Sequence, residues 1–371
     1  MPRPETGPFK KVLLLALASV LITALVLEVV FRTAIPASDE PFAYFDAPEE
    51  LLRYDATRHR EGTYTVGPLA RSLSHWHVNN CGWNSDIDYL PRESRTLPLL
   101  AIIGDSFVEA LNVDTDRSLA ARLRQRLVGR YDVYSFGMSG APLSQYLQEA
   151  RYVRRRFHPE VLVFVLIHND FHESFRPQSV HPHFLHVRKA GAGFAEEDPE
   201  PYRPNTIRRF LARSALVRYV WLNLKTDAIR KAWFRARAGQ TGAPRPPAVA
   251  EIPPVVQGAT AFLIERIVHE NRDSRVLFVT DGPRREIYSG TVAGSDGERY
   301  NRLVRSVCDR LGCPLLDLTV QFRACYERDG RRFETPYDGH WDAHGHEVVA
   351  DALYDWLEKQ EWRPAAVVHP P

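Results

Sequence analysis

A serine, three histidines and several aspartates occur in two short segments that lie far apart in the chain. Ser106 follows the apolar run 98–103, in Gly-Asp-Ser-Phe. The segment 337–346 holds three histidines and two aspartates. A serine hydroxyl becomes nucleophilic when a histidine takes its proton and a carboxylate orients that histidine. We therefore take Ser106 as the candidate nucleophile, His340 as the candidate base and Asp338 as the candidate orienting carboxylate.

Other interpretations of these two segments remain open. Asp342 with His344 or His346 is a second pairing of carboxylate and base. Histidines and aspartates so close together also suggest a metal site, but the segment lacks the H-E-x-x-H pattern. We expect neither a metal ion nor another cofactor. The triplet before Phe107 is also typical of a turn in which the serine caps a helix.

Two further segments carry groups that can donate hydrogen bonds to a negatively charged oxygen. Gly137 follows the apolar run 133–136, and glycine leaves its backbone N–H unobstructed. Asn169 follows the run 161–167 and carries a side-chain amide. Each is ambiguous alone, because glycines form turns and an Asn also forms caps and Asx-turns. Together they are candidates for an oxyanion site.

Short apolar runs alternate with helical patterns from residue 98 onward. The runs are 98–103, 133–136, 161–167, 275–280 and 314–317, and the helical patterns lie near 118–128, 144–157, 256–271, 298–311 and 345–358. This alternation predicts parallel βαβ units and an α/β fold, a three-layer α/β/α sandwich with a five-stranded parallel sheet. Ser106, Gly137 and Asn169 then follow strands whose carboxyl ends meet at one edge, where such sheets place their sites.

The N-terminus predicts a membrane anchor. Residues 12–30 are almost continuously apolar, which is long enough to cross about 30 Å of hydrocarbon at ~1.5 Å per residue. Arg3, Lys10 and Lys11 precede the run, so the positive-inside rule places residues 1–11 in the cytoplasm, a span at 12–32 and the remainder outside. A cleaved signal peptide is the alternative. Glu28 is expected at the interface or paired with Arg32.

The regions around the predicted sheet are a lead-in segment at 33–97 and an insertion at about 171–255 within a domain at 98–360. Residues 206–238 of the insertion predict an amphipathic basic helix, and 239–254 a linker. Between residues 203 and 245 there are about eleven Lys and Arg against the single acid Asp227. Such a helix suits an anionic lipid or polymer, a lid over the site, or an ordinary solvated surface.

The totals exclude several classes of protein. The chain has 371 residues and a formal net charge of +2, which gives no signal for a nucleic-acid partner. Its four cysteines are too few for a disulfide scaffold and lack zinc-site spacing. In an oxidising compartment Cys308 can pair with Cys313, or one of them with Cys81 or Cys325.

Four ordered motifs resemble those of the SGNH/GDSL hydrolase family, and the N-terminal segment resembles its membrane-anchored bacterial members. The motifs are 104–107, Gly137, Asn169-Asp170 and 338–341. The resemblance implies a flavodoxin-like sheet, catalysis by Ser106 and His340, and an oxyanion hole made by the Ser106 and Gly137 N–H groups with Asn169. Two positions depart from the family pattern. Ile167 replaces a glycine two residues before Asn169, and one residue rather than two separates Asp338 from His340.

These observations lead to a functional hypothesis: a serine ester hydrolase that acts through an acyl-enzyme, anchored in the inner membrane with its catalytic domain in the periplasm. Its substrate would be an acyl ester, such as an acylated glycan or a lipid. We expect activity to fall as His340 is protonated. Two alternatives are an O-acyltransferase or deacetylase of a cell-surface polysaccharide and a non-catalytic envelope binding protein.

Overall fold

The structure is a computed structural model that describes residues 7–175, 181–203, 205–224, 251–360 and 362. These residues form two compact units. Among the described residues, the smaller unit draws on 7–40, 63–73 and 205–224, and the larger on 41–62, 74–175, 181–203, 251–360 and 362. The candidate site residues all belong to the larger unit.

The larger unit contains one five-stranded parallel sheet. Its strands are β5 (Leu99–Gly104), β6 (Asp132–Gly137), β7 (Val161–Leu166), β10 (Arg275–Thr280) and β11 (Leu315–Asp317), in the order β11-β10-β7-β5-β6. Every residue of β5 and β7 is buried, as expected of central strands covered on both faces. The five-stranded parallel sheet is confirmed, and its order is that of flavodoxin-like folds.

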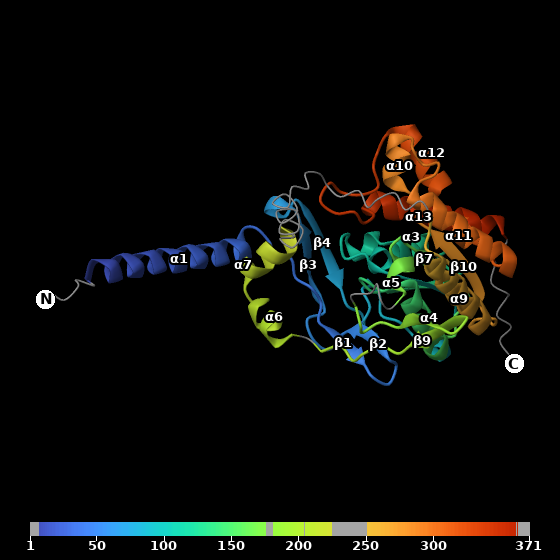
Figure 1. Cartoon of the computed structure of the whole chain (residues 1–371), viewed down its shortest axis with the longest axis horizontal. Coiled ribbons are helices and arrows are strands. Elements are labelled where there is room, and N and C mark those ends of the chain that lie inside the picture. The colour runs from blue at the N-terminus through green and yellow to red at the C-terminus, as the bar shows by residue number, and fades with distance from the viewer. Residues whose placement is uncertain (1–6, 176–180, 204, 225–250, 361, 363–371) are drawn as a thin grey trace. The chain divides into compact units, whose positions relative to one another are not determined.

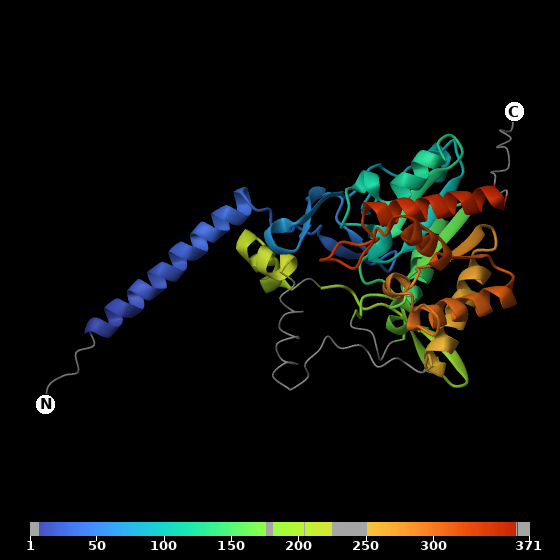
Figure 2. The ribbon, with the colours of Figure 1, turned by 90° about the horizontal axis from the view of Figure 1, so that it is seen from above.

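Helices cover both faces of this sheet. The helices α3 (Leu119–Arg126) and α13 (Ala343–Lys359) pack together on one face, and α4 (Leu143–Phe157), α9 (Pro254–Glu270) and α11 (Asp296–Leu311) cover the other. Figure 1 shows these elements along the chain, and Figure 2 shows the red α13 lying along the strands of the sheet. The three-layer architecture is therefore confirmed.

Side-chain caps set the starts of three of these helices. Ser118 accepts a hydrogen bond from the backbone of Ala121, Ser295 from Glu298 and Asp342 from Gly345. Each cap satisfies a backbone N–H that has no partner within its own helix. Gly312 ends α11 with φ 67°, a left-handed conformation that favours glycine. Asp342 is thus a structural cap in this fold.

The lead-in segment contains strands that the sequence pattern did not predict. β1 (Ala43–Asp46) pairs with β2 (Leu51–Tyr54), and β3 (Glu61–Val66) forms a second pair with β4 (Ser72–His77). Such hairpins are short and half-buried, so their apolar alternation spans too few residues to be distinctive.

Part of the lead-in covers the outer edge of the sheet. The strand β6 lies at that edge, where unpaired backbone groups would otherwise be exposed. The Tyr89 hydroxyl accepts a hydrogen bond from the Ser135 N–H and donates one to the Ser135 carbonyl, both at 2.8 Å. Its ring stacks on Tyr134 with centroids 4.0 Å apart. This stretch of the lead-in is therefore integral to the larger unit.

The insertion is only partly helical where the structure describes it. The strands β8 (His186–Ala190) and β9 (Gly193–Glu197) form a hairpin, which was not predicted. The helix predicted from residue 206 is divided into α6 (Thr206–Leu211), α7 (Ala215–Arg218) and the π-helical turn η5 (Tyr219–Asn223). Ser214 explains the break, because its side chain caps α7 by accepting a bond from Val217. The rest of that predicted helix, 225–238, and most of the predicted linker lie outside the described residues.

The remaining elements are short, apart from α1 (Gly7–Thr33). They are the helices α2 (Ser106–Glu109), α5 (Asp170–Glu173), α10 (Arg284–Ser289) and α12 (Thr319–Asp329), and the 3-10 turns η1 (Pro68–Ala70), η2 (Arg92–Ser94) and η3 (Thr115–Arg117). Among the described residues, α1 is the one helix long and apolar enough to cross a membrane, over Phe9–Thr33. All four cysteines are free thiols.

Candidate active site

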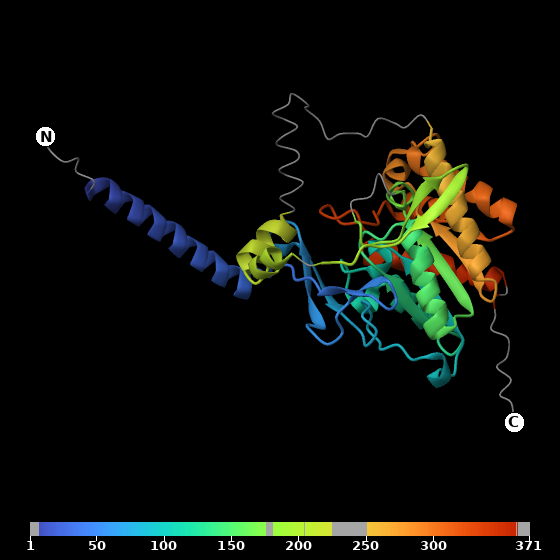
Figure 3. The same cartoon turned by 60° about the horizontal axis from the view of Figure 1, so that its bottom comes forward.

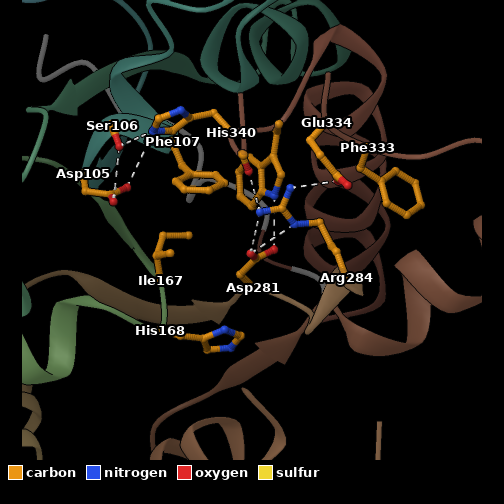
Figure 4. A network of polar contacts seen from close by, with 12 residues as sticks. Asp105, Ser106, Phe107, Ile167, His168, Asp281, Arg284, Phe333, Glu334 and His340 are labelled. Carbon is orange, nitrogen blue, oxygen red and sulfur yellow. Dashed lines mark hydrogen bonds and ion pairs between the residues drawn. The ribbon is translucent and has the colours of Figure 1, made fainter. Parts of the chain in front are cut away.

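Ser106, His340 and Asp338 form one chain of hydrogen bonds. Ser106 is the first residue of α2, directly after β5, and its Oγ lies 2.7 Å from His340 Nε2. The Asp338 Oδ1 atom accepts from His340 Nδ1 and, at 3.1 Å, from the His340 backbone. Because a carboxylate can only accept, Nδ1 carries the proton and Nε2 is free to accept from the serine hydroxyl. Figure 4 shows Ser106 beside the His340 ring.

Asp342 and His346, which the sequence left open as a second pair of carboxylate and base, bind other backbone groups. Asp342 caps α13, where it accepts from the Gly345 N–H at 2.8 Å. His346 is fully buried, and its Nδ1 accepts from the Leu119 N–H at 3.1 Å. Burial lowers the pKa of His346 to about 3, which keeps this ring neutral. Within the described part of the chain, no group of three or more His, Cys, Asp or Glu side chains is placed to hold a metal ion.

Asp105, and not Ser106, caps the helix that follows β5. Its carboxylate accepts from the Phe107 N–H at 2.9 Å, which leaves the serine as the first helical residue. The interpretation of the triplet as a turn capped by its serine is thus wrong. Burial raises the pKa of Asp105 to about 7, against the opposing effects of the Phe107 bond and of His340. A titrating carboxyl therefore adjoins the candidate nucleophile.

Gly137 allows two backbone segments to touch behind Ser106. It pairs with Gly104 across β5 and β6. A Cβ atom at position 137 would lie 2.1 Å from the Glu109 nitrogen and 2.6 Å from the Val108 carbonyl carbon. Any side chain would push α2 away from the end of β6. The sequence indicated only that glycine leaves this N–H unobstructed, and the structure adds a close approach to the helix that begins with Ser106.

Asn169 lies after β7, as the sequence predicted. Its side-chain hydrogen bond is to a residue of α5, the short helix that it directly precedes. Its side chain is exposed and donates to Glu173 at 3.2 Å. An amide carries two N–H donors, and this bond uses one of them. Ile167, at the departure from the family pattern, is buried and donates its N–H to Asp170 at 2.8 Å.

No sequence pattern indicated the buried glutamate that connects α2 to the segment after β6. The Glu109 carboxylate accepts hydrogen bonds from the Ser139 and Tyr54 hydroxyls, and its backbone carbonyl accepts from Asn84 at 2.7 Å. Burial raises the pKa of Glu109 above its ordinary value. The lead-in segment thus supplies two of the groups that fix the helix carrying Ser106. Isolated polar residues in a lead-in give no pattern that would have revealed this role.

Arg284 was also missed, and it holds the loop that carries His340. Its Nη2 donates to the Gly339 carbonyl at 3.0 Å, between the candidate carboxylate and the candidate base. Asp281 at 3.3 Å and Glu334 at 3.2 Å hold its guanidinium from two other segments. Its side chain is only 12% exposed, so these ion pairs are well shielded from water.

The same arginine supports the rings around His340. The guanidinium carbon lies 5.3 Å from the centre of the Phe107 ring, and that ring lies 4.8 Å from His340. Trp341 Nε1 donates to Asp281 at 3.1 Å. Figure 4 shows the Phe107 ring between His340 and the Arg284 cluster. Asp281 directly follows β10. Because sites form at the ends of parallel strands, this position was the one feature of the sequence that pointed to the cluster.

A second buried acid lies in the helix layer beside the site. Glu149 of α4 is fully buried, and neither of its carboxylate oxygens has a hydrogen-bond partner among the described residues. Burial, together with the charges of Asp105 and Glu109, raises the pKa of Glu149 well above its ordinary value. Burial thus favours the neutral form of Glu149.

We expect Arg284→Met to lower kcat for a chromogenic acyl ester by about 10- to 100-fold with little change in KM, because misplacing a reactive group by ~1 Å has effects of that size. Arg284→Lys should be intermediate, since a lysine cannot reproduce the fork of donors. Arg285→Met, at an exposed position of the same helix, is the control. An unchanged kcat in Arg284→Met would show that the His340 loop does not need this arginine.

Gly137→Ala should destabilise the larger unit by about 1–3 kcal/mol or more, because the new Cβ overlaps backbone atoms that have no rotamer to change. Denaturant unfolding of the full chain measures this loss. Gly193→Ala is the control, because a Cβ there has no atom closer than 4.0 Å. Equal stabilities of the two variants would contradict the close contact between α2 and β6.

Glu149→Gln should stabilise the protein more at pH 8 than at pH 5. The native pKa of Glu149 is raised, so above the ordinary pKa of glutamate only the unfolded chain loses this proton, and stability falls as pH rises. Because glutamine does not titrate, the stability of the variant does not fall with pH for this reason. Urea unfolding at both pH values, with exposed Glu61→Gln as the control, measures the difference. The same gain at both pH values would mean that Glu149 is ionised in the fold.

A family model and several solved structures match this chain. A family model described as GDSL-like lipase/acylhydrolase matches residues 102–348. A comparison with curated proteins finds no match. Similar solved structures include a carbohydrate acetylesterase family member from Sinorhizobium meliloti (14% identity, 70% of this chain and 98% of that chain, TM-score 0.37) and a lipolytic G-D-S-L family protein from Veillonella parvula (7%, 71% and 100%, 0.39). Because the family model covers more than half of the chain, the protein belongs to the GDSL-like lipase/acylhydrolase family of ester hydrolases.

Proposed function

We propose that this protein hydrolyses acyl esters outside the cytoplasmic membrane, with Ser106 as the nucleophile and α1 as its anchor. The observation that carries the chemistry is the chain of hydrogen bonds from Ser106 through His340 to Asp338. The anchor is supported by the length and hydropathy of Phe9–Thr33 and by the basic residues at its start.

In the first half of the reaction the Ser106 Oγ attacks the ester carbonyl carbon, and His340 Nε2 takes the hydroxyl proton. The carbonyl π electrons move to the oxygen and form a tetrahedral oxyanion. When that oxygen regains its double bond, the ester C–O bond breaks and His340 returns the proton to the leaving alkoxide. Asp338 holds the ring in one tautomer and stabilises the imidazolium between the two proton transfers.

In the second half a water molecule replaces the alcohol. His340 removes one proton from the water while the water oxygen attacks the acyl carbon. The bond between the acyl carbon and Ser106 Oγ then breaks, and the serine oxygen takes that proton from His340. A carboxylic acid is released and the hydroxyl of Ser106 is restored. If a sugar hydroxyl takes the place of water, the same steps transfer the acyl group, so the acceptor alone separates hydrolysis from acyl transfer.

We assign the oxyanion donors to the N–H groups of Ser106 and Gly137 and to the second N–H of the Asn169 amide. Preorganised donors of this kind are worth about 2.7–4 kcal/mol each in the transition state of acyl transfer. The contact of α2 with Gly137 supports the first two donors, because it brings the helix of Ser106 against the end of β6.

Ser106→Ala should abolish labelling of the full chain by a fluorophosphonate probe, because the probe phosphonylates an activated serine. Asp338→Asn should slow labelling strongly, by analogy with the ~10⁴-fold loss that follows when a triad histidine has the wrong tautomer. Ser289→Ala, at an exposed serine, is the control. Undiminished labelling of Ser106→Ala would sink the assignment.

Substrate class is tested with a panel of acyl esters of increasing chain length and with acetylated sugars. Release of free acid in proportion to alcohol indicates hydrolysis. A shift of acyl mass onto an added glycan, at the expense of free acid, would replace hydrolysis by acyl transfer as the main reaction.

A further inference from the structure

A carboxylate near the end of α1 accounts for the position of the insertion helices in the smaller unit. Glu28 accepts hydrogen bonds from the Ala215 N–H at 3.0 Å, the Leu216 N–H at 2.9 Å and the Ser214 hydroxyl at 2.7 Å. Arg32 Nε donates to it at 2.6 Å. Glu28 is thus paired with Arg32, as one of the sequence expectations held, and it is also bound to the first turn of α7.

These bonds satisfy both the Glu28 carboxylate and the first N–H groups of α7. The first N–H groups of a helix have no acceptor within the helix, and the N-terminal end of the helix dipole favours a negative charge. Glu28 fills that position while four donors surround its two oxygens. A charged residue in an otherwise apolar helix is costly unless it is paired. The contact with α7 therefore explains how α1 tolerates a glutamate.

Packing extends the contact around Glu28 into a small core. The Phe31 ring stacks on Tyr219 with centroids 3.9 Å apart. Ala37, Ala215 and Tyr219 are buried together, with Phe31 packed against them. Figure 3 shows the yellow helices of residues 206–223 against the end of the blue α1. The last turns of α1 are thus part of a folded unit.

This attachment fixes the depth of the insertion helices relative to the apolar run. Glu28 lies two residues before the end of the run 12–30, a distance of about 3 Å along a helix. If the run fills the hydrocarbon layer, Ala215 and Leu216 lie at its outer boundary, because they touch Glu28 directly.

The insertion helices carry exposed side chains that suit such a boundary. Ile207 is 71% exposed, Phe210 66% and Trp221 39%. The Arg213 guanidinium lies over the Phe210 ring, 5.8 Å from its centre. Aromatic rings and long basic side chains are the groups that proteins place at membrane interfaces, where one end is apolar and the other is wet.

We propose that residues 206–223 lie in the outer interface of the membrane that α1 crosses, and that Glu28 pins them there. Their partner is the headgroup and upper acyl region of the lipid. This inference rests on the proposed membrane anchoring. It also requires that α1 stays attached, because cleavage after the apolar run would remove Glu28 and Phe31 from the folded unit.

The depth of Trp221 tests the proposal in the full chain. The chain is reconstituted in vesicles of phosphatidylcholine and phosphatidylglycerol, with and without phosphatidylcholine brominated on its upper acyl carbons, which quenches nearby tryptophans. We expect Trp221→Phe to lose a substantial part of the bromolipid-dependent quenching. Trp356→Phe, a change in α13 of the larger unit, should leave that quenching unchanged.

The role of Glu28 is tested in the same vesicles. Glu28→Leu should reduce the quenching that depends on Trp221 and speed proteolysis between residues 203 and 215, because α7 loses its acceptor. Glu28→Gln retains one acceptor oxygen and should behave between Glu28→Leu and the parent chain.

Flotation of the vesicles tests membrane anchoring by α1 separately from the interfacial placement of residues 206–223. If the chain floats with the vesicles but Trp221→Phe is quenched like the parent, the anchor stands and the interfacial placement is wrong. Self-association of the floated chain would then assign the exposed surface to a second copy. If the chain does not float with the vesicles at all, the anchoring itself is wrong and this inference falls with it.

Discussion

The contact between the end of β6 and the backbone of α2 is the constraint on which the site depends. Gly137 and Gly104 are paired in register, and a side chain at Gly137 would collide with the Glu109 backbone. This contact sets the direction in which α2 leaves the sheet, and therefore the position of Ser106. Glu109, on the same short helix, ties it to Ser139 and to the lead-in segment. The nucleophile is thus held by backbone packing and by buried hydrogen bonds of its own helix.

The other half of the site depends on charge as well as packing, because Trp341 beside His340 is fully buried. The loop with Asp338 and His340 is closed by backbone bonds from Asp338 to Thr335 and from Asp342 to Phe333, and side-chain contacts connect it to other segments. Arg284 supplies them by binding the Gly339 carbonyl while Asp281 and Glu334 hold its guanidinium. Because these groups are shielded from water, their ion pairs are stronger than surface pairs. These two sets of contacts bring the Ser106 Oγ and His340 Nε2 atoms to 2.7 Å from each other.

Sequence patterns predicted the sheet because buried parallel strands are continuously apolar, and they predicted the order of Ser106, Gly137 and Asn169 because each follows a strand. The role of Glu109 was out of reach, because its partner Tyr54 lies 55 residues away in the chain and leaves no local pattern. Arg284 also binds a residue 55 positions away, Gly339, and only Asp281 at the end of a strand pointed to its cluster. The sequence around Glu149 does not show that this carboxyl is buried. The break at Ser214 was missed since a serine is tolerated within helices and caps them only when the tertiary contacts favour it. Strands β1 to β4, β8 and β9 were missed because short half-buried hairpins lack a distinctive period.

The most direct test of the account is the identification of the acylated residue during turnover. The full chain is mixed with an activated ester, quenched in acid before the acyl group is hydrolysed, digested and analysed by mass spectrometry. The account predicts one acyl group, carried on the peptide that contains Ser106, at a level that rises in the first turnover and then stays constant. An acyl group on another residue, or steady hydrolysis with no acylated peptide at any time, would contradict it.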